Sequence, residues 1–334
     1  MSQQPPPEPR DPWADQPPSG QPPVWGPGQP PYGQYPGYPP VQPYGDQPGY
    51  PYPYQPAGYG WFDPNDPLVT PPGTGIGGWT SRISATIQRS WRTLLPIIFI
   101  TQALPGLVLA VFSTVSTARL EAVAASAEPD PAALVGPGVF IVVALLVALL
   151  AVFLSAIGWA AGTWAMAREA VGAPAGLGAA LRYGMSRALG LGGWSLLMGL
   201  IIGVGICACV LPGIYLAFAL SLAGPVYLFE RTNPIGRAFS LFHSALGVVL
   251  GRVALLALVV VGGSFLIELV TSTFGVAVGV GTGITFGVVL VTLISTLLTL
   301  PLTVVQLVGL VTTYAERRGL EGPVNTGQLV TELG

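Results

Sequence analysis

The feature that most limits what this chain can fold into is an apolar run, residues 188–229, that contains no charged side chain. As a single α-helix it would extend about 63 Å, roughly twice the hydrocarbon thickness of a bilayer. The run must therefore turn back on itself inside a membrane. Leu211-Pro212-Gly213 is the strongest helix breaker near its middle, which predicts a very tight hairpin of two spans, 193–211 and 213–229.

The rest of the chain supplies four more apolar segments of spanning length. Only 8% of the 334 residues are charged, against about 25% in an ordinary soluble domain. The final stretch, 253–315, has room for two spans and a loop or for three tightly joined spans, and two is the more economical reading. We therefore predict an all-α, six-span transmembrane helical bundle over residues 76–320. The four further spans are 93–115 (bent by Pro96 and Pro105), 139–165, 253–273 and 286–312.

The placement of the arginines predicts the orientation of the bundle. With six spans, every arginine after residue 75 except Arg119 falls on one side of the membrane. By the positive-inside rule, both termini are expected in the cytoplasm of a bacterium, with the protein in its plasma membrane. A third span in the last stretch would carry Arg317 and Arg318 outside, which again favours two.

Two cytoplasmic connections, 176–189 and 235–250, mix arginine with apolar residues at helical spacing. They are expected to form amphipathic helices in the membrane interface. His243, the only histidine, lies in the second connection, as a solvated imidazole or as a proton switch.

Residues 1–75 form a low-complexity tail of Pro, Tyr, Gly and Gln. It has too few aliphatic residues to bury a core, so we expect it to be disordered. Either it is a solvated tether, or its prolines and tyrosines dock protein partners. The acidic balance of the tail argues against nucleic acid as a partner. Residues 321–334 are expected to form a short cytoplasmic C-terminal tail.

A few polar residues in or beside the spans are candidates for function. Glu268 is the only ionisable residue well inside a predicted span, as a functional carboxylate or at a partly wetted outer position. Glu230 ends a span beside Arg231 and seven residues before Arg237, which favours a structural salt bridge. Gln102, Gln306 and four threonines at helical spacing either make interhelical hydrogen bonds or line a polar path. These threonines are Thr292, Thr296, Thr299 and Thr303.

Glycines at four-residue spacing predict close helix packing. The longest series is Gly275, Gly279, Gly283 and Gly287. If the segment is helical, these residues form one face that another helix or a second copy of the chain can approach, giving a homo-oligomer. If not, the segment is a flexible external or re-entrant loop. Gly158-xxx-Gly162 and Gly199-xxx-Gly203 are weaker instances of the same pattern.

The segment LPGIYLAFALSLAGPVYLFERTNPIGRAFSLF, which begins at Leu211, resembles the bacterial glycerophosphoryl diester phosphodiesterase membrane-domain family. The positions that match are Pro212, Gly213, Glu230, Ala238 and, less closely, Ser240. The tail and the junction DPLVTPPGTGIGGW (66–79) also resemble proline- and glycine-rich membrane proteins of actinobacteria. The resemblance covers residues 64–320 and implies a six-span fold of undefined biochemical role. It implies no phosphodiesterase activity, because that catalytic barrel needs about 250 further residues.

The chain lacks the residue patterns of common catalytic sites. There is no paired Asp, no HExxH and no catalytic Ser/His pair, and the only cysteines are Cys207 and Cys209. We therefore expect no enzyme activity, no cofactor and no metal. The expected function is that of a scaffold or lipid-associated membrane component, with membrane lipids as partners and a tail that recruits proteins. The alternative is a transporter or channel-like subunit for a small or amphipathic solute, using Glu268, Gln102 and the threonines.

Overall fold

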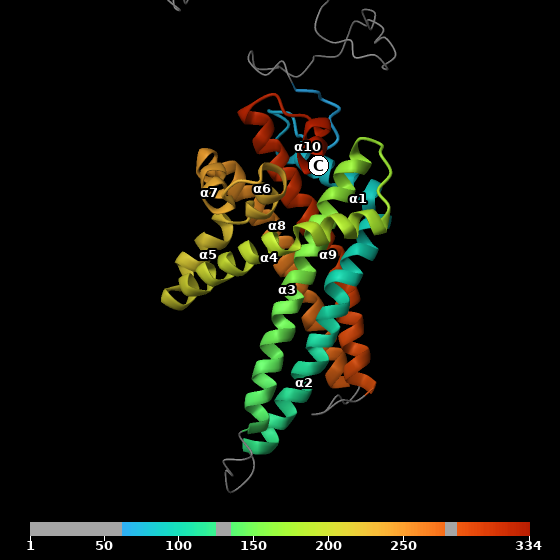
Figure 1. Ribbon diagram of the computed structural model, residues 1–334, viewed down its shortest axis with the longest axis vertical. Helices are drawn as coiled ribbons and strands as arrows, with labels where there is room; N and C mark the ends of the chain where they lie inside the picture. Colours follow the sequence, from blue (N-terminus) through green and yellow to red (C-terminus); the bar gives the residue numbers. More distant parts are fainter. Residues whose placement is uncertain (1–61, 125–134, 278–285) are drawn as a thin grey trace, which may run out of the picture. The chain divides into compact units, whose positions relative to one another are not determined.

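The computed structural model describes residues 62–124, 135–277 and 286–334, all of which belong to one compact unit, residues 54–334 (Figure 1). In these ranges all the regular secondary structure is helical, and there is no strand. The expected all-α class is confirmed. The elements are α1 (Gly75–Ile98), η1 (Phe99–Ala103), α2 (Leu104–Ala124), α3 (Val135–Ala170), α4 (Leu177–Ala208), α5 (Val210–Ala219), α6 (Ala223–Glu230), α7 (Pro234–Ser244), α8 (Leu246–Ala277), α9 (Phe286–Glu321) and α10 (Thr326–Leu333).

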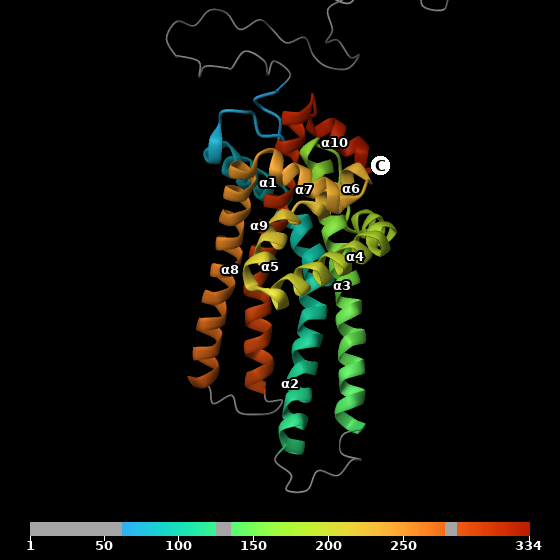
Figure 2. The same ribbon diagram turned by 90° about the vertical axis from the view of Figure 1, so that its left-hand side faces the viewer.

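Within the described residues, six helical stretches are long and apolar enough to cross a membrane, as the sequence predicts. The last apolar stretch holds two of them, α8 and α9. The six are Gly75–Ala110, Ile141–Ala170, Leu177–Ala208, Val210–Glu230, Leu246–Gly275 and Phe286–Glu321. In both ribbon views α2, α3, α8 and α9 run along one direction, whereas α4 and α5 cross them (Figures 1 and 2).

The first of these stretches changes its helical form between its two prolines. A π-helical segment, Phe99–Ala103, separates α1 from α2 and lies between Pro96 and Pro105. Proline removes a backbone donor and displaces the carbonyl one turn earlier, so the ladder of hydrogen bonds must shift there. The bend that the sequence predicts is thus a change to π geometry, which turns Thr101 toward the bundle core.

The turn of the α4–α5 hairpin lies three residues before the predicted Pro-Gly breaker. Cys209 is the single extended residue between the two helices, with φ −169° and ψ 137°. Pro212 falls in the first turn of α5, where a missing N–H costs little. Gly213 allows close contact, since a Cβ there would meet the backbone nitrogen of Ile206 at 2.7 Å. The predicted interfacial helix 176–189 is the first half of α4, not a separate element.

The connection from α6 to α8 contains the second expected amphipathic helix, α7. Arg231 has a left-handed backbone, φ 53°, which ends α6 sharply. Asn233 then caps α7 by accepting hydrogen bonds from the N–H groups of Ile235 and Gly236, with Pro234 in the first turn. α7 ends at Ser244, so the predicted range 235–250 divides between α7 and the start of α8.

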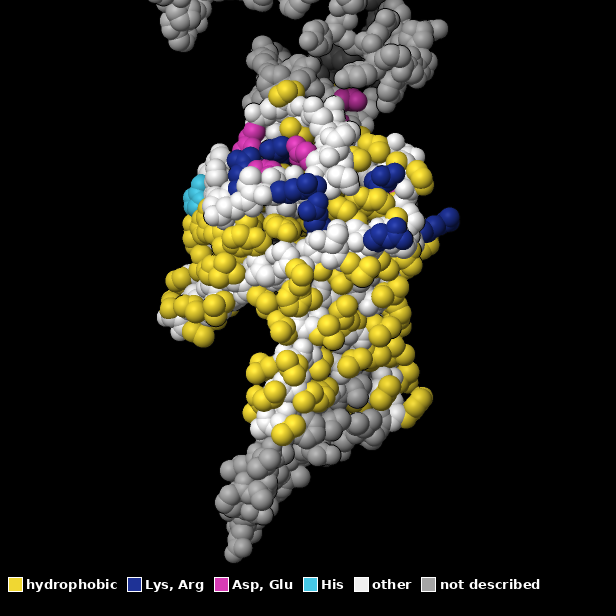
Figure 3. Space-filling view, viewed as in Figure 1, with side chains coloured by type: hydrophobic (Ala, Val, Ile, Leu, Met, Phe, Trp, Pro, Cys, Tyr) yellow, Lys and Arg dark blue, Asp and Glu magenta, His cyan; other side chains and the backbone are white. Residues whose placement is uncertain are grey.

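Both ends of the described chain pack into the bundle at the same end. Leu68, Val69 and Thr70 are buried, although they lie inside the range assigned to the tail. Residues 321–334 contain the helix α10, whose Leu329 and Leu333 join the same core. Figure 3 shows charged side chains gathered at this end and an apolar surface over the long helices. The packed body therefore begins before Gly75 and extends beyond residue 320.

Candidate functional site: an apolar cavity beneath a charged cap

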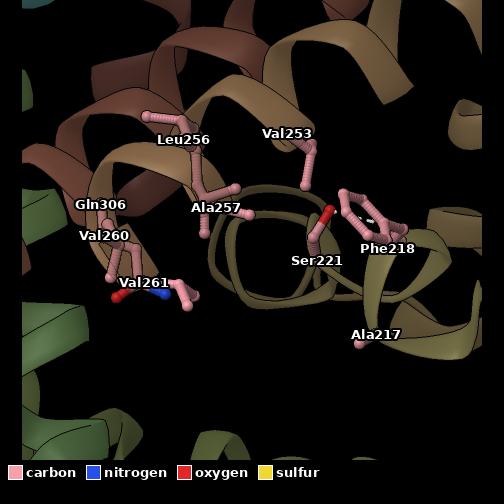
Figure 4. A pocket seen from close by; sticks show the side chains of 10 residues that line it. Ala217, Phe218, Ser221, Val253, Leu256, Ala257, Val260, Val261 and Gln306 are labelled. Atoms are coloured by element: carbon pink, nitrogen blue, oxygen red, sulfur yellow. Dashed lines mark hydrogen bonds between the residues drawn. The ribbon is translucent and has the colours of Figure 1, made fainter. Parts of the chain in front are cut away.

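The most prominent hollow in the described part of the chain is a pair of adjoining cavities of about 700 and about 200 Å³. The larger lies among α2, α3, α4, α6 and α9, and the smaller lies between the α5–α6 connection and helices α8 and α9. Ala217, Ser221, Gln306 and Leu310 line both. Figure 4 shows the smaller one, with Phe218 and Ser221 on one side and the α8 and α9 side chains on the other.

The walls of these cavities are almost entirely aliphatic, with a few neutral polar groups. Ser155 and Trp159 of α3, Ser195 of α4 and Ser221 contribute polar atoms to the larger cavity, together with Gln306. The Ser221 hydroxyl donates to the carbonyl of Phe218. Among the described residues, the Gln306 side-chain amide has no hydrogen-bond partner. No charged side chain lines either cavity, so the space suits a hydrocarbon chain with a few polar contacts.

The other residues predicted to line a polar path do not line either of these two cavities. Gln102 and Thr101 face α3, where a Cβ added to Gly158 would meet the Thr101 hydroxyl at 2.1 Å and the Gln102 amide nitrogen at 3.3 Å. The four threonine hydroxyls of α9 donate to carbonyls of their own helix, three or four residues earlier. Within the described residues, these four hydroxyls make no interhelical hydrogen bond. A bond of this kind satisfies the threonine hydroxyl within its own helix and slightly destabilises or bends that helix.

Glu268 stands apart from the cavities. It is exposed on α8, and within the described residues no side-chain partner contacts its carboxylate. Its own carbonyl accepts a hydrogen bond from Thr271. A carboxylate on an outward-facing position of a span is tolerated where water or headgroups reach it.

Glu230 occupies the centre of an ion-pair cluster at the charged end of the bundle, where both ends of the described chain pack. We call this end the cap. The Oε2 of Glu230 accepts from Nε of Arg237 at 2.8 Å, and its Oε1 accepts from the hydroxyl of Tyr314 at 3.1 Å and lies 3.5 Å from Nη1 of Arg318. Arg237 also pairs with Glu321. The predicted bond to Arg237 is present, and the neighbouring Arg231 instead donates to the carbonyl of Leu333 at 3.0 Å. The cluster joins α6, α7, α9 and α10.

The charges around Arg237 act on its protonation. Burial lowers the pKa of Arg237, but its hydrogen bonds and proximity to Glu321 and Glu230 outweigh burial, so its pKa is raised above its ordinary value. Arg237 thus remains a cation at every working pH.

A second charged group, buried between α1, α8 and α9, was not singled out by sequence. Arg252 pairs with Glu316 and lies 5.7 Å from the ring centroid of Trp79. The Trp79 indole donates to Thr313 at 3.0 Å, and Arg317 donates to Ser244 at 2.9 Å. In the sequence, Arg252 and Glu316 each lie at the charged end of an apolar segment. That position does not indicate that the two side chains form an ion pair.

Asp66 fastens the N-terminal junction to the C-terminal helix. Its carboxylate accepts hydrogen bonds from the N–H groups of Leu68 at 2.9 Å, Val69 at 2.7 Å and Thr326 at 2.8 Å, and from the Thr326 hydroxyl at 2.5 Å. Thr326 begins α10, so the carboxylate also lies favourably at a helix N-terminus. Arg231 holds the other end of α10. Asn-Asp-Pro at 65–67 was a turn signal, but its partner, 260 residues away, was not predictable.

The predicted glycine series is only partly within the described residues. Gly275 is in α8 and Gly287 is in α9, whereas Gly279 and Gly283 lie outside the described ranges. A packing role for this series stays a prediction. The observed close contacts occur at other glycines. At several of these, an added Cβ would lie too close to a residue of a neighbouring segment. Examples are Gly158 with Thr101, Gly162 with Leu307, Gly184 with the carbonyl of Ile157, Gly192 with Phe153, and Gly205 with Gly213.

The described residues contain no group of three or more His, Cys, Asp or Glu that could hold a metal ion. Comparison with known proteins adds no neighbour, since no family model, curated protein or solved structure matches the chain.

Proposed function

We propose that this chain is a non-enzymatic, lipid-associated membrane protein that holds a hydrocarbon chain in its cavity and recruits partners through its tail. The observation that carries the proposal is the cavity of about 700 Å³, lined by aliphatic side chains and neutral polar groups. It lies among helices apolar enough to cross a membrane, so lipid is the most abundant molecule that can reach it.

Loss of bound lipid in a variant with a filled cavity would test this proposal. Ala217→Trp puts a large side chain into both cavities, and Leu258→Trp makes the same addition on the exposed face of α8. In native mass spectrometry of detergent-purified protein, the natural chain and Leu258→Trp should retain a lipid, whereas Ala217→Trp should lose it. Equal retention by both variants, at unchanged Tm, would contradict the proposal.

The transport alternative has less support from the arrangement of its candidate residues. Glu268 lies outside the cavity lining, the α9 threonines are bonded within their own helix, and Gln102 packs against Gly158. Gln306 is the one candidate that faces the cavity. Solute uptake into reconstituted vesicles that is lost in Glu268→Gln would favour transport over lipid holding.

Partner recruitment by the tail rests on its composition of proline and tyrosine. In-cell crosslinking followed by mass spectrometry should capture specific proteins with the full chain and lose them when residues 1–61 are removed. Residues 62–74 must be retained, because they include the buried junction around Asp66. Identical captures from both chains would show that the tail is a tether.

The expected setting of this function is the bacterial plasma membrane with the tail in the cytoplasm. The support for that orientation is the arginine distribution and the docking of the junction around Asp66 against the C-terminal helix at the arginine-bearing end. The resemblance to the phosphodiesterase-associated membrane-domain family is compatible with a role that involves lipid.

A further inference from the structure

The α4–α5 hairpin presents exposed apolar side chains over its outer half. Leu200 is 65% exposed, Val204 61% and Leu211 74%, and both arms lie within the uncharged run 188–229. In α4, a Cβ added at Gly193, Gly199 or Gly203 would meet nothing within 4 Å. The outer half of this hairpin therefore touches little protein apart from its own second arm.

The base of the hairpin, by contrast, is held firmly. Gly184 packs on the carbonyl of Ile157 of α3, and Gly192 on the ring of Phe153. On α5, the hydroxyl of Tyr215 donates to Nε2 of His243, whose Nδ1 donates to the carbonyl of Phe239. The single histidine is thus exposed but bonded at both nitrogens, and it ties α5 to the interfacial helix α7.

A stack of side chains marks the level at which α4 meets the membrane surface. Arg168 lies 5.0 Å from the ring centroid of Trp164, and Arg187 lies 5.8 Å from that of Tyr183. The two rings stack with centroids 5.9 Å apart. Arginine and amphipathic aromatic side chains concentrate at the headgroup level. The hairpin therefore starts at the arginine-bearing interface.

The short second arm limits how deep the tip can lie. From Tyr215, which is bonded to α7, back to Cys209 is about 9 Å at 1.5 Å per residue. The distance along the helix from Ala217, which faces Gln306 across the smaller cavity, back to Cys209 is about 12 Å. From Gln306, α9 continues about 30 Å further to Phe286. Whatever its tilt, the tip ends about 18 Å short of the far end of α9, and Figure 2 shows the long helices continuing past it.

We propose that the α4–α5 hairpin enters and leaves the membrane from the arginine-bearing side, and that its exposed surface binds the acyl chains of that leaflet alone. Two of the six apolar helices then form a wedge in one leaflet, and four spans cross the bilayer. The number of crossings remains even, so the termini stay on one side. The wedge adds apolar volume to one leaflet only, which makes its insertion sensitive to curvature.

Acyl chains are favoured as the occupant over a second copy of the chain. No charged side chain is exposed on either arm around the tip. The polar groups exposed there are the thiols of Cys207 and Cys209 and the hydroxyl of Tyr215, which is already bonded to His243. A lipid leaflet needs no orienting polar groups, whereas specific helix pairs in membranes combine small-residue faces, such as Gly199-xxx-Gly203 here, with polar contacts between the chains.

The two native cysteines, Cys207 and Cys209, are exposed at the tip and make the proposal directly testable. The comparison site is Phe286→Cys in a Cys207→Ser/Cys209→Ser background, at a position 84% exposed at the far end of α9. Right-side-out and inside-out vesicles are treated with a negatively charged maleimide. When the reagent is added on the face at which the thiol of Phe286→Cys reacts, Cys207 and Cys209 should react at least about tenfold more slowly than that thiol. The reason is that hydrocarbon excludes the charged reagent.

A depth measurement separates the remaining outcomes. A nitroxide on Cys207 should collide readily with oxygen and rarely with a water-soluble nickel chelate, as expected of a label in hydrocarbon. Tip labelling from the face of residue 286 at a similar rate would overturn the proposal in favour of two full crossings. Free access of the nickel chelate from the arginine-bearing side would place the hairpin outside the bilayer. Efficient oxidation of the tip cysteines to a disulfide-linked dimer would replace lipid by a second copy as the occupant.

Discussion

Single charged residues in this protein fall into two kinds, those that hold the cap together and one that stands alone in a span. Glu230 meets Arg237, Arg318 and Tyr314, and its side chain is only 10% exposed. Glu268 is exposed and has no side-chain partner within the described residues. Removing the charge should therefore lower stability at Glu230 and have little effect at Glu268.

Glu230→Gln should lower the free energy of unfolding by about 2 kcal/mol, because it leaves Arg237 and Arg318 with a poorer acceptor. Glu268→Gln should change it by less than about 0.5 kcal/mol. Thermal unfolding in detergent, followed by tryptophan fluorescence, measures both. Since the pKa of Arg237 is raised above its ordinary value, the stability contributed by its charge is present throughout the ordinary pH range and is lost only in strong alkali. Equal losses of unfolding free energy in Glu230→Gln and Glu268→Gln would contradict the stabilising role assigned to Glu230.

Asp66→Ala should lower the free energy of unfolding by about 2 kcal/mol, because the N–H groups of Leu68, Val69 and Thr326 lose their acceptor. Asp63→Ala is the matched control, because Asp63 is exposed and accepts only a local bond from Asn65. Limited proteolysis should cut Asp66→Ala faster near α10 and leave Asp63→Ala unchanged. An intact α10 in both variants would show that the Asp66 contacts are dispensable.

At the scale of helices, glycines that have another small residue four positions away divide according to what they face. Gly184 and Gly199 both lie in α4, yet a Cβ at Gly184 meets the carbonyl oxygen of Ile157 at 2.5 Å and a Cβ at Gly199 meets nothing. A spacing rule treats such positions alike, because it cannot tell which face of a helix has a neighbour.

Gly184→Ala should lower stability by about 1–3 kcal/mol through overpacking against a backbone that cannot move aside. Gly199→Ala should raise it by about 0.5–1 kcal/mol by restricting the unfolded chain. Parallel melting curves of the two variants provide the test, and a loss at Gly199 as large as that at Gly184 would mean that another surface covers the outer part of α4.

At the scale of the whole molecule, the N-terminal junction and the C-terminal helix complete one cap. Removal of residues 1–61 should leave the Tm of the body within about 2 °C, since this segment has too few aliphatic residues to bury a core. A chain that starts at Gly73 loses Asp66, Leu68 and Val69 and should melt at least about 4 °C lower. Circular dichroism melts in one detergent compare the two truncations. Equal melting would show that the junction adds no stability.

The apolar helices were predictable from sequence, but not all their bounds, because the helices that begin at Gly75 and Leu177 start roughly four to five turns before the predicted 93 and 193. Their packing partners were not predictable. Uncharged length identifies 139–165 within α3 and 286–312 within α9, because the cost of placing charge in hydrocarbon is local to each segment. The predicted Pro212-Gly213 turn moved to Cys209, since proline is acceptable in a first helical turn. Among the candidate residues, only Gln306 reached the cavity, because that depends on which side of α9 faces the hairpin.

By itself the sequence determined the all-helical class, the number of apolar helices and the side that carries the arginines, since each follows from composition along a continuous segment. Only the tertiary structure decided that the α4–α5 hairpin crosses the long helices, that Glu230 lies among arginines from two other helices, and that Asp66 caps a helix 260 residues away. Such contacts depend on the rotation and depth of each helix. Close packing at a few glycines, such as Gly184, fixes the rotation and the depth of the helices. The local sequence around such a glycine does not indicate which residue will pack against it.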